Sequence, residues 1–228
     1  MLHYAVAGLL VHALYLGGVF VGISLGVEDG VSAMIVSVQP LLVAAFAGLA
    51  LAERVTPRQW AGLALGLLGV VLILARKLGH GLGDVLGVLA CVAALLGMTA
   101  GTLYQKRHCA GMDLRTGNVV QFGASAAATG LLALALEDVR DVAWTGEFAF
   151  ALAWLVFVLS LGAISLLYLL IRRGAASRVA SLFFLVPPCT ALIAWPLFGE
   201  RLGPVELLGM GLAVAGVALA SRAPAPGG

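Results

Sequence analysis

The chain of 228 residues is too apolar for a soluble protein, because 62% of its residues are hydrophobic and only 11% are charged. Soluble globular chains carry about 45–50% apolar and about 25% charged residues. The net charge of +2 and the lack of a basic patch with interleaved aromatic residues give no support to a nucleic-acid partner, and we expect none. We therefore expect an integral membrane protein surrounded by the lipid bilayer.

Eight apolar stretches follow one another along the chain, each long enough for a helix that crosses a hydrocarbon core of about 30 Å. The predicted spans are Tyr4–Gly26, Gly30–Ala52, Arg58–Ala75, Asp84–Tyr104, Gly117–Leu136, Glu147–Ile171, Arg178–Gly199 and Pro204–Ser221. The first is expected to be a retained helix, because it exceeds a signal-peptide core and no basic segment precedes it. Asn118 and Gln121 make the fifth span the weakest. Residues 223–228, rich in Pro and Gly, are expected to form a disordered tail.

The positions of Lys and Arg predict the orientation in the membrane, because short cytoplasmic connectors carry an excess of these residues. With the N-terminus inside, the inner connectors hold Arg54, Arg58, Lys106, Arg107, Arg115, Arg172, Arg173, Arg178 and Arg222. The outer connectors hold only Arg76, Lys77, Arg140 and Arg201. We expect both termini to be cytoplasmic, in a multi-pass protein of the plasma membrane (the inner membrane of a bacterium).

An internal repeat relates the second and third spans to the seventh and eighth by a shift of 147 residues. The shift pairs Pro40 with Pro187, Glu53 with Glu200, Arg54 with Arg201, Pro57 with Pro204, Gly62 with Gly209, and Gly69 with Gly216. On the predicted topology the first Glu-Arg turn is cytoplasmic and the second is external, so the two copies are inverted. Inverted repeats are typical of secondary transporters that work by alternating access to a midplane site. A duplicated bundle that transports nothing is the alternative.

The repeated pattern P-x12-E-R-x2-P-x4-G-x6-G, from Pro40 to Gly69 and from Pro187 to Gly216, resembles the EamA-domain branch of the drug/metabolite transporter superfamily. The stretch Gly174–Pro188 is similar to the ninth helix of that family. The resemblance implies ten helices in two inverted five-helix halves, with both termini cytoplasmic. Aligned on the repeat, the first predicted span matches the third helix of the family, so the family's first two helices have no counterpart in this sequence.

The implied fold class is an all-α membrane protein: eight transmembrane helices from an inverted-repeat (5+5) transporter bundle, with the first repeat shortened to three helices. We place the first repeat at residues 1–76 and the second, of five helices, at residues 81–222. The implied function is a secondary transporter, a permease or exporter for small organic solutes. The alternative is a non-transporting shortened fragment or an assembly subunit of such a carrier. A homodimer is left open.

The candidate substrate-binding residues are the polar and irregular positions inside the spans. His12 is the only ionisable side chain predicted near mid-depth, and it shares a helix face with Gly8, Tyr15 and Gly22. This face either lines a cavity, or His12 is a neutral side chain hydrogen-bonded to a neighbouring helix. Gln39 precedes Pro40, whose missing N–H frees a backbone carbonyl, and cavity lining is favoured there over helix–helix contact.

Weaker candidates are side chains that in membrane helices more often serve packing than ligand contact. They are Thr102, Tyr168, Ser181, Ser165 and Met98. The predicted substrate-binding set is therefore His12, Tyr15, Gln39, Pro40, Thr102, Tyr168 and Ser181. Pro187 and Pro188 are expected to kink the seventh span.

Other conspicuous residues are interpreted as structural. Thr56-Pro57-x-Gln59 has the form of a capping box, and Glu53 and Glu200 precede helix starts, where a carboxylate suits the positive end of the helix dipole. The three cysteines are too scattered for a disulfide framework or a zinc site. The spans contain no intramembrane Ser/His pair, paired Asp or HExxH set, so we expect neither an enzyme nor a metal or cofactor.

Overall fold

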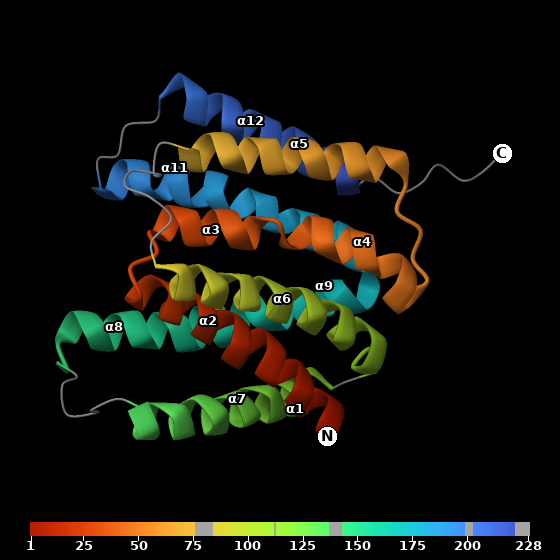
Figure 1. Ribbon diagram of the computed structural model, residues 1–228. Helices are drawn as coiled ribbons and strands as arrows, with labels where there is room; N and C mark the ends of the chain where they lie inside the picture. The colour runs from red at the N-terminus through yellow and green to blue at the C-terminus, as the bar shows by residue number, and fades with distance from the viewer. Residues whose placement is uncertain (76–83, 112, 137–142, 199–202, 222–228) are drawn as a thin grey trace.

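The computed structural model describes residues 1–75, 84–111, 113–136, 143–198 and 203–221, and every regular element in these ranges is helical (Figure 1). The described residues contain eight helical spans that are long and apolar enough to cross a membrane. They are Leu2–Ser24, Asp29–Leu51, Pro57–Leu74, Val85–His108, Arg115–Ala135, Gly146–Arg173, Ala176–Ile193 and Pro204–Ser221. These spans confirm the predicted ones.

Four of the spans are divided into shorter helical segments. The first span consists of α1 (Leu2–Gly8), the π-helical η1 (Leu9–Leu14) and α2 (Tyr15–Ser24). The second is α3 (Asp29–Ser37) and α4 (Gln39–Leu51), and the third is α5 (Pro57–Leu74). The fourth and fifth are α6 (Val85–His108) and α7 (Leu114–Leu136). The sixth is α8 (Gly146–Trp154), the π-helical η4 (Leu155–Ala163) and α9 (Ile164–Arg173). The seventh is α10 (Ala176–Ser181), the 3₁₀ turn η5 (Leu182–Leu185) and α11 (Val186–Phe198), and the eighth is α12 (Pro204–Ser221).

The predicted capping box at the start of α5 is confirmed. The Thr56 hydroxyl accepts the backbone N–H of Gln59 at 3.3 Å, and the Gln59 side-chain oxygen accepts the backbone N–H of Thr56 at 2.8 Å. Pro57 takes the first helical position, where its missing N–H costs nothing. These contacts fix Thr56 as the last residue of the α4–α5 connector.

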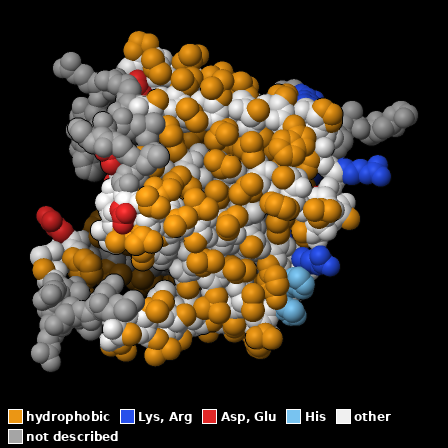
Figure 2. Space-filling model, viewed as in Figure 1, with side chains coloured by type: hydrophobic (Ala, Val, Ile, Leu, Met, Phe, Trp, Pro, Cys, Tyr) orange, Lys and Arg blue, Asp and Glu red, His pale blue; other side chains and the backbone are white. Residues whose placement is uncertain are grey.

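The spans alternate in direction, so Met1 and the end of α12 lie on the same side of the bundle, which we call the Met1 edge (Figure 1). Every Lys and Arg among the described residues is at a span end on this edge, whereas Glu28, Asp29, Asp84, Glu147 and Glu206 are at span ends on the opposite edge. Figure 2 shows the apolar band between acidic side chains on one side and basic side chains on the other. Arg76, Lys77, Arg140, Arg201 and Arg222 lie outside the described residues.

Helices α5 and α12, which are equivalent in the repeat, pack against each other in opposite directions. Gly62 near the start of α5 faces Ala220 near the end of α12, and Gly69 farther along α5 faces Gly209 near the start of α12. The lack of side chains at these glycines lets the two backbones touch. The two copies of the repeat are therefore inverted, as predicted.

The prolines of the repeat mark equivalent breaks in two spans. Helix α3 ends at Ser37 and α4 begins at Gln39, directly before Pro40. In the second copy the 3₁₀ turn η5 gives way to α11 at Val186, directly before Pro187. Proline removes a backbone donor, and irregular backbone at membrane depth is tolerated where protein or a cavity surrounds it. The prolines that are expected to kink the seventh span therefore directly follow a change from 3₁₀ to α-helix.

Candidate functional site

A cavity of about 350 Å³ lies among α2, α3, α6 and the broken seventh span. Its lining residues are Tyr15, Val19, Ile23, Asp29, Ser32, Ala33, Val36, Ser37, Gln39, Met98, Phe183, Val186 and Pro187. Asp29 is at the edge opposite Met1, and Gln39 is about 15 Å farther along the second span at a rise of 1.5 Å per residue. Since the hydrocarbon core is about 30 Å thick, the cavity reaches from that edge to about the midplane.

Both copies of the repeat contribute equivalent residues to this cavity. The shift of 147 residues relates Gln39 to Val186 and Val36 to Phe183, and all four side chains line it. The cavity therefore lies at the interface between the two inverted copies, beside the two proline breaks. Substrate sites of inverted-repeat transporters lie at this kind of interface, near discontinuous helices.

Few polar groups line the inner end of the cavity. The Gln39 side-chain amide donates to the Thr102 hydroxyl at 3.4 Å, and this hydroxyl donates to the backbone carbonyl of Met98 at 2.8 Å. The hydrogen bond fixes the orientation of the Gln39 amide, which is 2% exposed. Together with Tyr15, Gln39 gives a mainly apolar chamber two polar side chains at depth.

Four buried side chains form a directed hydrogen-bond chain across four spans. The Tyr168 hydroxyl donates to the Gln121 side-chain oxygen at 2.6 Å, so its own oxygen accepts from the Nε2–H of His12 at 3.0 Å. The Gln121 amide donates to the Gln105 side-chain oxygen at 3.2 Å. His12 therefore has its proton on Nε2, and its ring stacks on Phe122 with centroids 4.3 Å apart.

This hydrogen-bond chain lies between the cavity and the Met1 edge. His12 precedes Tyr15 in a span that starts at the Met1 edge, and Gln105 follows Met98 in a helix that ends there. Polar groups buried at this depth need partners, and satisfied networks hold helices together rigidly. The chain of bonds ties the first, fourth, fifth and sixth spans together on the Met1 side of the cavity.

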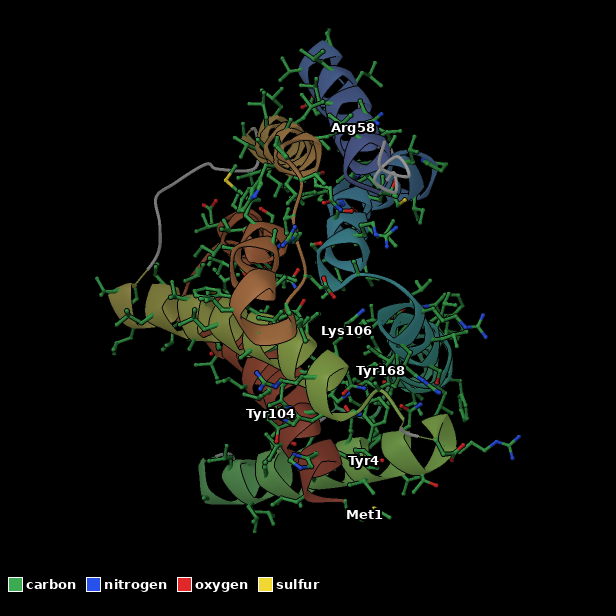
Figure 3. All side chains as sticks on the ribbon, turned by 90° about the vertical axis from the view of Figure 1, so that its right-hand side faces the viewer. Met1, Tyr4, Arg58, Tyr104, Lys106 and Tyr168 are labelled. Atoms are coloured by element: carbon green, nitrogen blue, oxygen red, sulfur yellow. The ribbon has the colours of Figure 1, made fainter. Side chains whose placement is uncertain are left out.

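A charged cluster closes the same side at the membrane edge. Glu53 is 3.3 Å from the Lys106 ammonium, and its carboxylate oxygens accept the backbone N–H of Ala176 at 3.0 and 3.2 Å. Lys106 also donates to the carbonyl of Gly174. In Figure 3, which views the Met1 edge, Lys106 and Tyr168 lie near the middle of the bundle. The cluster joins the ends of α4 and α6 to the start of α10.

The sequence of the chain matches a known family over nearly its whole length. Residues 2–75 and 85–222 match the model of the EamA-like transporter family. The chain belongs to the EamA-like transporter family. A solved crystal structure, 23% identical, shares the fold with a TM-score of 0.82 and covers 95% of this chain and 75% of its own chain.

Two bacterial proteins are relatives of this EamA-type membrane transporter by sequence. "Uncharacterized transporter YvbV" of Bacillus subtilis (strain 168) is 29% identical over 217 residues, which are 95% of this chain and 70% of that protein. "Uncharacterized inner membrane transporter YedA" of Escherichia coli (strain K12) is 25% identical over 219 residues, or 96% of this chain and 70% of that protein.

The residues predicted from the sequence fall into three groups in this EamA-type bundle. Tyr15 and Gln39 line the cavity, Pro40 is buried next to Gln39, and Thr102 holds the Gln39 amide. His12 and Tyr168 belong instead to the hydrogen-bond chain on the Met1 side. Ser181, fully buried, donates to the carbonyl of Arg178 and stays within its own helix turn.

The residues of the helix face predicted around His12 contact different parts of the bundle. Gly8 packs on the backbone of Gln121 and Gly22 packs on α6, so these glycines serve close helix contacts. Tyr15 is the member of this face that lines the cavity. The hydrogen bond to Tyr168 corresponds to the alternative in which His12 contacts a neighbouring helix. The π-helical η1 also changes the register between Gly8 and Tyr15.

Gln105 and Gln121 are the network members that sequence reasoning missed. In the sequence Gln121 only makes the fifth span weaker, and the predicted fourth span ends at Tyr104, just before Gln105. Their polar side chains close to the end of an apolar run were the available signal, but such a residue can equally face lipid headgroups. A related hydrogen bond joins α7 to α9: the Asn118 side-chain amide donates to the Ser165 hydroxyl at 2.7 Å.

Glu53 has a structural role, but at the start of a different helix from the one predicted. The sequence predicts that this carboxylate favours the start of α5, but in the structure it accepts the first N–H of α10. Ala52, in the left-handed conformation with φ of 54°, turns the chain so that Glu53 points toward α10. Its repeat equivalent, Glu200, lies outside the described residues.

The three cysteines do not line the cavity. Cys91, Cys109 and Cys189 are free thiols. Burial raises the pKa of the Cys109 thiol, just after the end of α6. In the described ranges, no group of three or more His, Cys, Asp or Glu side chains could hold a metal ion.

Proposed function

We propose that the chain carries small organic solutes across the membrane by alternating access, as a permease or exporter rather than an enzyme, with the α2–α3–α6–α11 cavity as its substrate site. The observation that supports this is the lining of one cavity by repeat-equivalent residues, Gln39 with Val186 and Val36 with Phe183. A site shared by two inverted copies can face either side of the membrane when one copy rocks against the other.

The lining suits a solute with an apolar body and one or two hydrogen-bonding groups. The volume of about 350 Å³ is at the lower end of the range for small-molecule sites, about 300–1,000 Å³. Tyr15 and Gln39 supply donors and acceptors at depth, while Val19, Val36 and Met98 supply apolar walls. This combination favours small metabolites and amphiphiles over large or highly charged solutes.

The contacts on the Met1 side would form the closed gate of this transport cycle. The His12–Tyr168 bond and the Glu53–Lys106 pair lie between the cavity and the Met1 edge. The excess of Lys and Arg supports assigning this edge to the cytoplasm, with both termini there. The described state then faces outward, and the solute reaches the cytoplasm only after both contacts break.

A transport assay with a filled cavity tests the substrate site. Ala33, an exposed side chain on the cavity wall, is replaced by Trp, and uptake of a panel of small organic solutes is measured in proteoliposomes. We expect A33W to abolish the uptake that the wild type shows. The control is Ala127→Trp, on an exposed position of α7 away from the cavity. Equal uptake by A33W and wild type would contradict the site.

Cysteine labelling tests the orientation. Single cysteines at Arg54, on the Met1 edge, and at Asp84, on the opposite edge, are introduced into a variant without native cysteines. A membrane-impermeant reagent added outside cells should label the position of Asp84 and leave that of Arg54 unlabelled. Labelling of Arg54 without Asp84 would contradict the orientation, and labelling of both positions from outside would contradict the crossing of α5 between them.

A second candidate function is that of an assembly subunit, and the sixth span favours it. Helix α8 and η4 have no buried residue, whereas the repeat-equivalent first span packs against α6 and α7. Further helices on α8 and η4 would make the two copies alike. Purified chain reconstituted alone distinguishes the candidates, because uptake by the chain alone contradicts an obligatory partner.

A further inference from the structure

A groove on the membrane-facing surface runs between α4 and α6, on a side of α6 that the substrate cavity does not use. Its deeper part, about 410 Å³, is lined by Phe46, Leu49, Ala50, Leu96, Thr99, Ala100 and Leu103. Its outer part, about 490 Å³, is lined by Leu49, Ala50, Leu51, Ala52, Lys106 and Arg107. The two parts share Leu49 and Ala50, so they form one continuous groove that ends at the Met1 edge.

The length of the groove matches one leaflet of the bilayer. Leu96, Leu103 and Arg107 follow at helical spacing on one face of α6. The rise from Leu96 to Arg107 is about 16 Å at 1.5 Å per residue. Half of a hydrocarbon core of about 30 Å is about 15 Å. The apolar part therefore extends from near the midplane to the edge, where the cationic side chains begin.

The apolar part of the groove offers no unsatisfied polar group to a ligand. The Thr99 hydroxyl donates to the carbonyl of Leu95 at 2.8 Å and is therefore already paired. Phe46 is 47% exposed and Leu96 54% exposed, so their apolar surfaces are open to a hydrocarbon chain. These walls suit an acyl chain and give it no polar contact.

The outer end of the groove carries one positive charge that has no ion-pair partner among the described residues. Lys106 is paired with Glu53, whereas Arg107 forms no ion pair within the described ranges. The Arg107 guanidinium donates to the carbonyl of Ala50 at 3.1 Å, which holds it over the groove. A guanidinium has five N–H donors in a fork that fits a phosphate, so this bond leaves others available.

We propose that the α4–α6 groove binds an anionic phospholipid of the leaflet at the Met1 edge. One acyl chain lies along Phe46, Leu96 and Leu103, and the headgroup phosphate accepts hydrogen bonds from Arg107. Basic pockets between transmembrane helices bind anionic headgroups, because a positive charge near the interface attracts them. The proposal does not depend on the transport function or on the substrate cavity.

The test measures lipid binding to the purified full chain in detergent by native mass spectrometry. Phosphatidylglycerol and phosphatidylcholine with identical acyl chains are titrated separately. We expect the wild type to bind phosphatidylglycerol about fivefold more tightly, the factor that one interfacial Arg supplies. Arg107→Gln should remove this preference, and Ala100→Trp, which fills the apolar part, should weaken the binding of both lipids.

Two matched variants control for position and for bulk. Arg58→Gln removes an exposed charge from the same edge outside the groove, and Ala127→Trp adds bulk to an exposed position on α7. Both should bind lipid as the wild type does. The proposal is overturned if the wild type shows no preference, if R107Q keeps it, or if R58Q loses it equally. It is also overturned if the groove is covered by a second copy, seen as a dimer that only A100W dissociates.

Discussion

Gly62 on α5 and Gly216 on α12 lie so close that neither can carry a side chain. A Cβ on Gly62 would be 2.7 Å from the carbonyl oxygen of Gly216, and a Cβ on Gly216 would be 2.6 Å from that of Gly62. The repeat shift turns this pair into Gly209 and Gly69, which also face each other. One contact thus occurs twice, related by the inversion of the two copies.

Gly62→Ala should destabilise the bundle by about 1–3 kcal/mol, the usual cost of overpacking, because backbone atoms rather than flexible side chains stand in the way. Gly211→Ala is the matched control, since a Cβ at Gly211 meets nothing within 4 Å. Thermal unfolding of the purified variants in detergent measures the difference. Equal melting temperatures for the two variants would show that α5 and α12 do not approach as described.

Tyr168→Phe should destabilise the chain by about 1–2 kcal/mol, because the hydroxyl that it removes makes two buried hydrogen bonds. Tyr4→Phe is the control, since no described residue forms a hydrogen bond with the Tyr4 hydroxyl. Denaturant unfolding in mixed micelles gives both values. A cost for Y168F no greater than for Y4F would mean that His12 and Gln121 are not joined through Tyr168.

The arrangement of the spans could be predicted from the sequence because it follows from patterns along the chain. Apolar runs indicate the helices, and Pro40 and Pro187 indicate the equivalent breaks, because proline lacks the backbone N–H that a helix interior uses and both prolines occupy the same position of the repeat. The inverted packing of α5 and α12 follows from the repeat combined with the positions of Lys and Arg. Each of these signals is local, or is a comparison of one stretch with another.

The partners of the polar side chains could not be predicted in this way. His12 and Tyr168 are 156 residues apart, and Gln39 and Thr102 are 63 residues apart. No local pattern states which buried donor meets which acceptor, since this depends on how the helices rotate and tilt. The π-helical η1 adds to the difficulty, because it shifts the helical register ahead of Tyr15.

Thr116→Val should raise the pKa of Asp113, which precedes α7. This pKa is below its ordinary value mainly because the backbone N–H of Thr116 donates to the carboxylate, and next because the Thr116 hydroxyl does so. Valine keeps the first bond and loses the second, so the pKa should rise but stay below the ordinary value. Carbon NMR of protein labelled at aspartate measures it, and Thr116→Ser should restore the wild-type pKa.

The same bonds predict how the start of α7 responds to acid. A pKa lowered on folding means that the contribution to stability is present above the unfolded pKa and is lost as the pH falls through the folded pKa. The protection factors of the amides in the first turn of α7, measured by hydrogen exchange, should therefore fall in acid, below the ordinary range of aspartate. Protection factors that fall equally in Asp113→Asn would contradict this origin.

Glu53 and Lys106 should be coupled by about 1–2 kcal/mol in a double-mutant cycle. Their side chains are 16% and 21% exposed, so the pair lies between a surface pair worth below about 1 kcal/mol and a buried pair whose disruption costs about 3–5 kcal/mol. Glu53→Gln keeps an acceptor for the Ala176 N–H but leaves Lys106 without a carboxylate, and Lys106→Met removes the charge that needs one. The double variant should therefore lose less stability than the two single variants together. Unfolding measured at low and high salt gives the coupling, and a sum that is strictly additive would show that the two charges do not interact across α4 and α6.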